Sequence, residues 1–268
     1  MTTLNWQNEI QLFMTIPHSG EYLPPECDWL KKLPPDVLLV DMDRFVDKLW
    51  EPIIDELKLE AHIFKWHRYA VDVNRPPQNH DSVSWLKIQK DPRLSFKGYS
   101  HWAFNSNLVP LLTKPISSSD HEKLMVQYHH PFHSWITNKF NHSPAPIKIH
   151  LDLHSMASVA KGLTPDGYSE RADIVLSDRD GQSSDPSLTE NLKHWLEKTG
   201  LTVVLNWPYK GAYDLIHADP TKNWNSIQIE INRKLYMDEK TKEIIPSLFS
   251  DLQKKLKISL QSFISSFN

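Results

Sequence analysis

The most evident candidate for chemistry is the end of an alternating stretch at residues 148–155, Lys-Ile-His-Leu-Asp-Leu-His-Ser. Polar and apolar residues alternate there as in a half-buried β-strand, because successive side chains of a strand point to opposite faces. His150, Asp152 and His154 would then share one face. This row predicts a metal site beyond the carboxyl end of the strand, with His154 as a ligand. For this segment alone, the alternative is a surface strand whose polar row faces water.

A second imidazole, His18, follows the apolar residues 11–16 in a Pro-His-Ser-Gly turn, and Glu21 lies three positions further on. Two histidines and one carboxylate, with a fourth position left open, make the usual catalytic zinc site. His-x-x-Glu is a weak motif by itself, and a turn with a solvated histidine and glutamate is the alternative. Asp43 competes with Glu21 as the carboxylate ligand. Its neighbours are expected on a solvated helix face: Asp36, Asp41 and Asp47.

The candidate general base is Glu230, in the alternating segment 226–232, Ser-Ile-Gln-Ile-Glu-Ile-Asn. Burial among the isoleucines of this strand is expected to raise the pKa of a carboxylate and to fit it for proton transfer near neutral pH. A salt bridge from Glu230 to Arg233 or Arg179 is the alternative.

Arginines and one further loop are candidates for holding a substrate. Arg75 offers a rigid fork for a carboxylate, Asn74 adds a donor, and the two prolines that follow stiffen the loop. Arg68 is a further candidate, with pairing to Asp72 as its structural alternative. The loop 206–211 and its surroundings could supply a positive charge or a phenol to the substrate, from Lys210 and Tyr213.

Composition excludes several other classes of function. The chain has 268 residues, 14 histidines and one cysteine, so an internal disulfide or a thiolate zinc cluster is excluded. Seven glycines and no glycine-rich motif argue against a phosphate loop or a dinucleotide site. The net charge of −3 gives no footprint for nucleic acid. No apolar run approaches the roughly 20 residues that span a membrane, and no signal pattern begins the chain, so a cytoplasmic location is expected.

Strands and helices alternate along the chain, which predicts an α/β fold with a mixed, mostly parallel sheet and helices on both faces. Ligands of such sheets bind beyond the carboxyl ends of the strands. We expect one domain over residues 1–268, with residues 78–115 as an irregular excursion over the cleft. The predicted strands are 11–16, 60–66, 69–73, 148–154, 172–176, 202–206 and 226–232. The predicted helices are 36–57 (kinked or split at Pro52), 119–141 with its cap at 119–122, 185–198 and 244–263.

Taken together, the motifs resemble the N-formylglutamate amidohydrolase family over nearly the whole chain. Each motif is modest alone, but their joint order is specific. They are IPHSG (16–20), DMD (41–43), HRYAVDVNR (67–75), DLHS (152–155), ADIV (172–175), NWPYKG (206–211), QIEINR (228–233) and YMDE (236–239). The resemblance implies a fold like that of the zinc carboxypeptidases (phosphorylase/hydrolase-like) and one zinc ion per chain.

The resemblance also implies roles. The zinc ligands would be His18, His154 and either Glu21 or Asp43, the carboxylate binders Asn74 and Arg75, and the general base Glu230, with Arg68 as a further contact to substrate or oxyanion. The implied reaction is hydrolysis of the amide of a small N-acylated amino acid, with N-formyl-L-glutamate giving formate and L-glutamate as the first choice. Another N-acyl amino acid or a peptide amide is the second choice, and a non-catalytic carboxylate-binding protein is the third.

Overall fold

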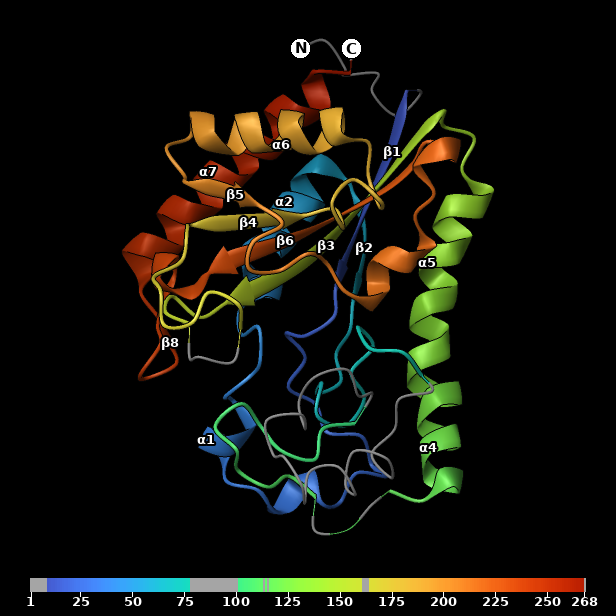
Figure 1. Cartoon of the computed structure of the whole chain (residues 1–268), viewed down its shortest axis with the longest axis vertical. Coiled ribbons are helices and arrows are strands. Elements are labelled where there is room, and N and C mark those ends of the chain that lie inside the picture. Colours follow the sequence, from blue (N-terminus) through green and yellow to red (C-terminus); the bar gives the residue numbers. More distant parts are fainter. Residues whose placement is uncertain (1–8, 78–100, 113, 115, 161–163, 268) are drawn as a thin grey trace. The chain divides into compact units, whose positions relative to one another are not determined.

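Six strands form one mixed sheet in the order β2-β1-β3-β6-β4-β5 in the computed structural model of the chain (Figure 1). The strands are β1 (Ile10–Ile16), β2 (Glu60–Ile63), β3 (Ile147–Met156), β4 (Ile174–Ser177), β5 (Val203–Leu205) and β6 (Trp224–Asn232). Strand pairs β1–β3, β3–β6 and β4–β5 are parallel, and β4–β6 is antiparallel. The predicted mixed, mostly parallel sheet is confirmed. The structure describes residues 9–77, 101–112, 114, 116–160 and 164–267.

The helices of the described residues are α1 (Pro35–Leu38), α2 (Val46–Leu57), α4 (Ser118–Leu124), α5 (His130–His142), α6 (Pro186–Lys198) and α7 (Pro246–Ser265). A π-helical turn, Met125–His129, joins α4 to α5. A two-stranded hairpin, β7 (Met237–Asp238) and β8 (Glu243–Ile244), precedes α7. Helix α7 packs against both α6 and α2. None of the helices in the described part of the chain is long and apolar enough to cross a membrane.

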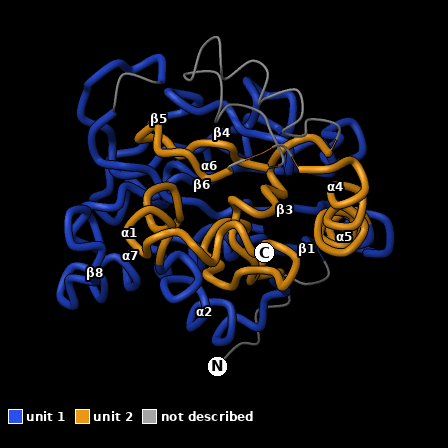
Figure 2. Tube along the Cα trace, turned by 90° about the horizontal axis from the view of Figure 1, so that it is seen from below, with its two compact units in different colours: residues 1–16, 45–61, 138–268 blue, residues 17–44, 62–137 orange. Residues whose placement is uncertain are grey.

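The chain divides into two compact units, which Figure 2 colours separately. The first unit comprises residues 1–16, 45–61 and 138–268 and holds strands β1 and β3 to β6. The second comprises residues 17–44 and 62–137 and has few regular elements apart from α1, α4 and most of α5. Several of its histidine side chains bind backbone carbonyl oxygens.

Strand β3 is buried on both faces, which corrects the prediction of a half-buried or surface strand. It lies between β1 and β6, and its residues from Lys148 to Met156 are all buried. Central strands of parallel sheets are covered on both sides, so an alternating sequence there does not mean an exposed face. The rings of Phe13 and Phe140 cover His150. The polar row of β3 therefore lies inside the protein.

Two predicted elements between residues 36 and 73 are wrong. The predicted helix 36–57 is interrupted at residues 39–45 rather than at Pro52, which lies within α2. Side chains hold the interruption, because Asp41 accepts hydrogen bonds from Tyr69 Oη (2.6 Å) and Ser106 N (2.9 Å). Asp41 is thus a structural group, not part of a solvated face. The predicted strand 69–73 is instead a series of turns.

The remaining elements agree with the prediction to within a few residues. Helix α6 begins after Asp185, whose side chain accepts from Ser187 N, and ends before Gly200, which has a φ of +84°. The helix predicted from residue 119 is capped two residues earlier, by Ser117, whose side chain accepts from Asp120 N. Strand β2 ends at Ile63, three residues before the predicted end. Of the excursion predicted at 78–115, residues 78–100, 113 and 115 lie outside the described residues.

Candidate functional site

In the first unit, the pairing of β3 with β6 places the predicted base beside a predicted ligand. His154 is opposite Glu230 in the register, and Asp152 is opposite Gln228. Paired residues of neighbouring parallel strands point to the same face, and such strands lie about 4.8 Å apart. Glu230 is 8% exposed and accepts a hydrogen bond from Gln228 Nε2 (2.8 Å). The two side chains that sequence analysis proposed for metal binding and proton transfer are therefore neighbours.

A buried chain of hydrogen bonds fixes the His154 ring. Its Nε2 lies 2.7 Å from Asp152 Oδ2, and Thr15 Oγ1 donates to Asp152 Oδ1 (2.8 Å). The chain continues from Thr15 Oγ1 to His150 Nε2 (2.8 Å), and from His150 Nδ1 to Ser226 Oγ (3.1 Å). Burial would raise the pKa of Asp152, but its interactions with His154, His150 and Thr15 together outweigh burial and lower it. A carboxylate behind an imidazole fixes the orientation of the ring, as is usual for histidines that bind metals.

A third acidic group, Asp214, was missed by sequence analysis. It lies in the short 3₁₀ helix η5 (Tyr213–His217) and is fully buried. One ligand atom each of Asp152, His154 and Asp214 lies within 4.8 Å of the others. No periodic pattern surrounds Asp214 in the sequence, so only the path of the chain after β5 reveals its place. It adds a second carboxyl group near His154.

In the second unit, a tightly packed turn presents His18. A Cβ on Gly20 would come within 2.3 Å of the carbonyl carbon of Lys65, so only glycine allows this close approach of two backbones. Tyr22 N donates to Lys65 O (3.1 Å), and His67 N donates to Tyr22 O (2.8 Å). The turn that carries His18 is thereby fixed against the segment 64–67.

The His18 ring lies between two aspartates of its own unit. Its Nε2 is 2.8 Å from Asp72 Oδ1, and its Nδ1 is 3.5 Å from Asp43 Oδ2. The backbone adds to this pairing, since Asp43 N donates to His18 O (3.0 Å). The competing carboxylate, Glu21, accepts from Arg44 Nε (3.1 Å) and has a side chain that is 54% exposed. Within this unit, the geometry favours Asp43 over Glu21 as the partner of His18.

Asp72 is the centre of the second unit's polar network. Sequence analysis predicted it only as a partner of Arg68. Its carboxylate accepts hydrogen bonds from Arg68 Nη2 (2.9 Å), Trp102 Nε1 (2.9 Å) and Asn74 N (3.0 Å), besides the contact with His18. Burial would raise the pKa of Asp72, but its interactions with His18 and with the Arg68 guanidinium lower it well below its usual range. The Asp72 carboxylate thus remains ionised behind His18.

The residues predicted to contact the substrate are divided between the two units and differ in burial. Arg68 is engaged by Asp72 and by the Asp41 carbonyl oxygen (2.9 Å from Nη1), and it lies over the Trp102 ring. The turn that carries Asn74 and Arg75 belongs to the same unit, with Asn74 buried and Arg75 half-buried. In the first unit, Lys210 forms an exposed ion pair with Asp180 (2.7 Å), and Tyr213 is half-buried in η5.

The donor chemistry of the two units fits a zinc ion. His18 and His154 each have Nε2 on a buried carboxylate, and each has a second carboxylate nearby. Imidazole and carboxylate are common zinc ligands, and carboxylates behind the ligating histidines are a recurrent feature of zinc sites. Each unit therefore contains one histidine with the kind of carboxylate partners that a zinc site requires.

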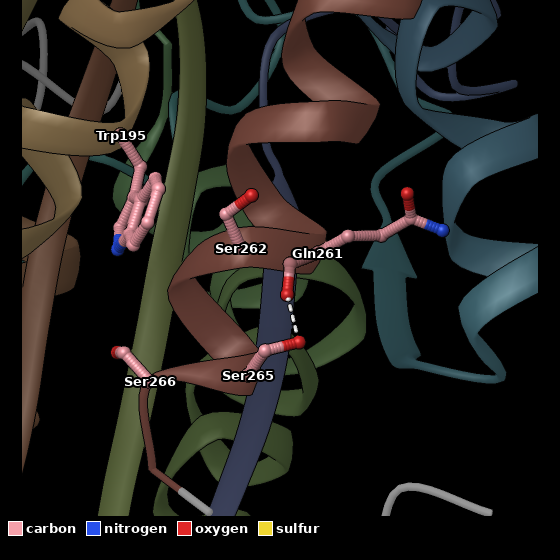
Figure 3. Close-up of a pocket in the computed structure, with 5 residues that line it drawn as sticks. All are labelled: Trp195, Gln261, Ser262, Ser265 and Ser266. Atoms are coloured by element: carbon pink, nitrogen blue, oxygen red, sulfur yellow. Dashed lines mark hydrogen bonds between the residues drawn. The ribbon is translucent and has the colours of Figure 1, made fainter. Parts of the chain in front are cut away.

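A cavity of about 370 Å³ elsewhere in the first unit offers no comparable chemistry. It lies between α6 and α7, and Figure 3 shows its lining: Trp195, Gln261, Ser262, Ser265 and Ser266. Ser265 Oγ donates to the Gln261 carbonyl oxygen (2.8 Å), so that hydroxyl is engaged within the helix. The lining has no imidazole, carboxylate or cation. We therefore assign no catalytic role to this cavity.

Buried histidines make the stability of the protein depend on pH. Burial lowers the pKa values of His67, His129 and His150 to about 4. In the unfolded chain they take up protons below about pH 6.5, so unfolding becomes easier as the pH falls from 6.5 towards 4. We expect each of these three histidines to lower the free energy of unfolding by about 2 kcal/mol at pH 5.

Denaturant unfolding at several pH values measures this loss. Substitution His150→Gln should flatten the dependence, whereas exposed His142→Gln should not; equal pH profiles would contradict the prediction.

Comparison with known proteins identifies the family of the chain. A sequence profile of the family described as N-formylglutamate amidohydrolase matches residues 10–237. A crystal structure of N-formylglutamate amidohydrolase from Ralstonia eutropha JMP134 has 26% identity and a TM-score of 0.79, covering 96% of this chain and 94% of that one. A gene product from Agrobacterium tumefaciens has 17% identity and a TM-score of 0.66, with coverages of 96% and 93%, and shares the fold. Among curated proteins, none matches the chain. Because the profile spans most of the sequence and both units, the resemblance is confirmed, and the chain belongs to the N-formylglutamate amidohydrolase family.

Proposed function

We propose that the protein is a zinc-dependent amidohydrolase that converts N-formyl-L-glutamate to formate and L-glutamate. The family match and the similar enzyme from Ralstonia eutropha support the reaction class and this substrate. The observation that carries the proposal is the pairing of Glu230 with His154 on neighbouring strands. It provides a base beside a metal-binding imidazole in a chain of this family.

In this proposal His18, Asp43 and His154 hold one zinc ion per chain. A bound zinc ion lowers the pKa of water to about 7 and polarises a carbonyl group. Glu230 accepts the proton of the attacking water and passes it to the amine that leaves. Asn74 and Arg75 bind the carboxylate of the amino acid, with Lys210 and Tyr213 as further contacts. Arg68 holds Asp72 in place, and its predicted contact with the oxyanion stays a prediction.

The choice between Asp43 and Glu21 can be tested by substitution. We expect Asp43→Ala to weaken zinc binding at least ten- to a hundredfold, the range seen when even a group behind the ligands is lost. Glu21→Ala should leave zinc affinity and kcat within about twofold, because its side chain pairs with Arg44. Zinc competition titration with a chromogenic chelator measures both. Normal zinc affinity in Asp43→Ala, with loss in Glu21→Ala, would reverse the assignment.

A deacylation screen tests the proposed reaction. N-formyl, N-acetyl and N-succinyl derivatives of glutamate and other amino acids are supplied with and without a chelator. We expect fastest turnover of N-formyl-L-glutamate, abolished by the chelator and restored by zinc. Preference for another acyl group would support the second substrate choice. A protein that contains no metal after metal-replete growth and turns over none of these amides would be a carboxylate-binding protein instead.

We also propose that residues 1–268 act as one domain, because one family profile runs through segments of both units. A cytoplasmic location accords with a substrate that is a small metabolite and with the single cysteine. Neither nucleic acid nor a membrane is expected as a partner.

A further inference from the structure

Hydrogen bonds hold the turn at residues 72–75, a segment without regular structure. All four of its successive carbonyl oxygens accept. Asp72 O accepts from Arg75 N (3.2 Å), and Asn74 O accepts from Arg75 Nη1 (2.7 Å). Val73 O accepts from His133 Nε2 (2.7 Å), and Arg75 O accepts from His129 Nε2 (2.8 Å). The two bonds from outside the turn are both given by imidazoles.

Both histidines are presented by one rigid element. His133 lies in α5 four residues after His129, the last residue of the π-helical turn Met125–His129. Residues four apart on a helix share a face, and π-helical turns occur often at functional sites. The two rings lie against each other, with centroids 4.4 Å apart. Both are buried, and burial lowers the pKa of His129 to about 4, so its ring is neutral at ordinary pH.

The two imidazoles bind either side of Asn74, at the carbonyls of the residue before it and the residue after it. The backbone amide of Asn74 is bound to the Asp72 carboxylate (3.0 Å). Each peptide group around Asn74 and Arg75 is therefore fixed by a side chain, rather than by a neighbouring strand. When the Arg75 guanidinium and the Asn74 amide are already held in position, less conformational entropy is lost when the ligand binds.

We propose that His129 and His133 are positioning residues that fix the Asn74–Arg75 turn for recognition of the substrate's amino-acid carboxylate. This inference rests on the proposed role of Asn74 and Arg75 and extends it to one residue of the π-helical turn and one residue of helix α5. The histidines do not touch the substrate. They act on its affinity, through the two carbonyl oxygens, and not on proton transfer at Glu230.

Matched amide substitutions test this role. The side-chain amide of glutamine can place a donor where the histidine Nε2 lies, whereas that of asparagine is one bond shorter. We expect His129→Asn and His133→Asn to raise KM for N-formyl-L-glutamate about tenfold each, with kcat within about twofold, because one hydrogen bond to the turn is lost. The glutamine variants should keep KM within about twofold. His121→Asn, on α4 and bonded to His101, is the control and should leave both constants unchanged.

Calorimetric titration with L-glutamate separates failure of this inference from failure of the proposed function. Weaker L-glutamate binding in the asparagine variants, restored by glutamine, supports the positioning role even if the wild type deacylates none of the amides. Equal KM and equal L-glutamate affinity in the asparagine and glutamine variants would overturn it. A fall in kcat that follows a loss of bound zinc or of folded protein would also overturn it, because the histidines would then serve general stability. A wild type with neither turnover nor L-glutamate binding would overturn both proposals.

Discussion

Glu230→Gln is expected to lower kcat by about 10²- to 10⁴-fold, the usual contribution of a general base. The substitution preserves size and removes only the negative charge that accepts the proton. KM should change by no more than a few-fold, because Glu230 is not among the proposed carboxylate binders. Bound zinc should remain, because Glu230 is not a proposed ligand. Steady-state kinetics and metal analysis of the same preparation measure these quantities.

The control for Glu230→Gln is Glu190→Gln, a glutamate on helix α6 whose side chain is 59% exposed. It should have the kinetic constants of the wild type. If Glu230→Gln retained near-normal turnover with zinc bound, Glu230 would not be the base, and the significance given to its pairing with His154 would be lost.

Asp72→Ala is expected to destabilise the protein by about 3–5 kcal/mol, because removing one partner of a buried ion pair leaves the other charge uncompensated. The uncompensated charge is that of Arg68, and three further donors lose their acceptor: His18 Nε2, Trp102 Nε1 and Asn74 N. We also expect zinc affinity to fall about 10- to 100-fold, since the His18 ring loses the carboxylate that orients it.

Denaturant unfolding and zinc competition titration measure the two effects of Asp72→Ala. The exposed Asp36→Ala, in the first turn of α1, is the control and should change the free energy of unfolding by less than about 0.5 kcal/mol. A loss below 1 kcal/mol in Asp72→Ala, at unchanged zinc affinity, would contradict the role of Asp72 as the centre of this network.

The sheet and its reactive strands could be predicted because their signal is local. The alternation at 148–155 and at 226–232 placed His154 and Glu230 on one face each, and the register of β3 with β6 makes them neighbours. The same alternation misled the prediction of burial, since the sequence of β3 does not reveal that β1 and β6 flank it. Side-chain periodicity reports the pleat of a strand and not its position within the sheet.

The second unit was harder to predict because side chains, rather than backbone ladders, hold its chain. Residues 69–73 are apolar enough for a strand, but Asp72 binds His18 and Trp102 from distant parts of the unit, besides its neighbours Arg68 and Asn74, and closes turns. Asp41 likewise interrupts the predicted helix by binding Tyr69 and Ser106. The bonds from His18, Trp102, Tyr69 and Ser106 join residues far apart in sequence, so no short window of the chain contains both partners. The same reason hid the contacts of His129 and His133 with the turn.

The most direct test of the central claim is the zinc content of His18→Ala and His154→Ala, compared with the wild type and with the exposed control His142→Ala. The claim is that these two histidines, 136 positions apart in the sequence, bind the same catalytic ion. We predict about one zinc per chain in the wild type and the control. In either single variant, zinc and deacylase activity should both be lost while the protein stays folded. One zinc per chain and normal turnover in either variant would contradict the account.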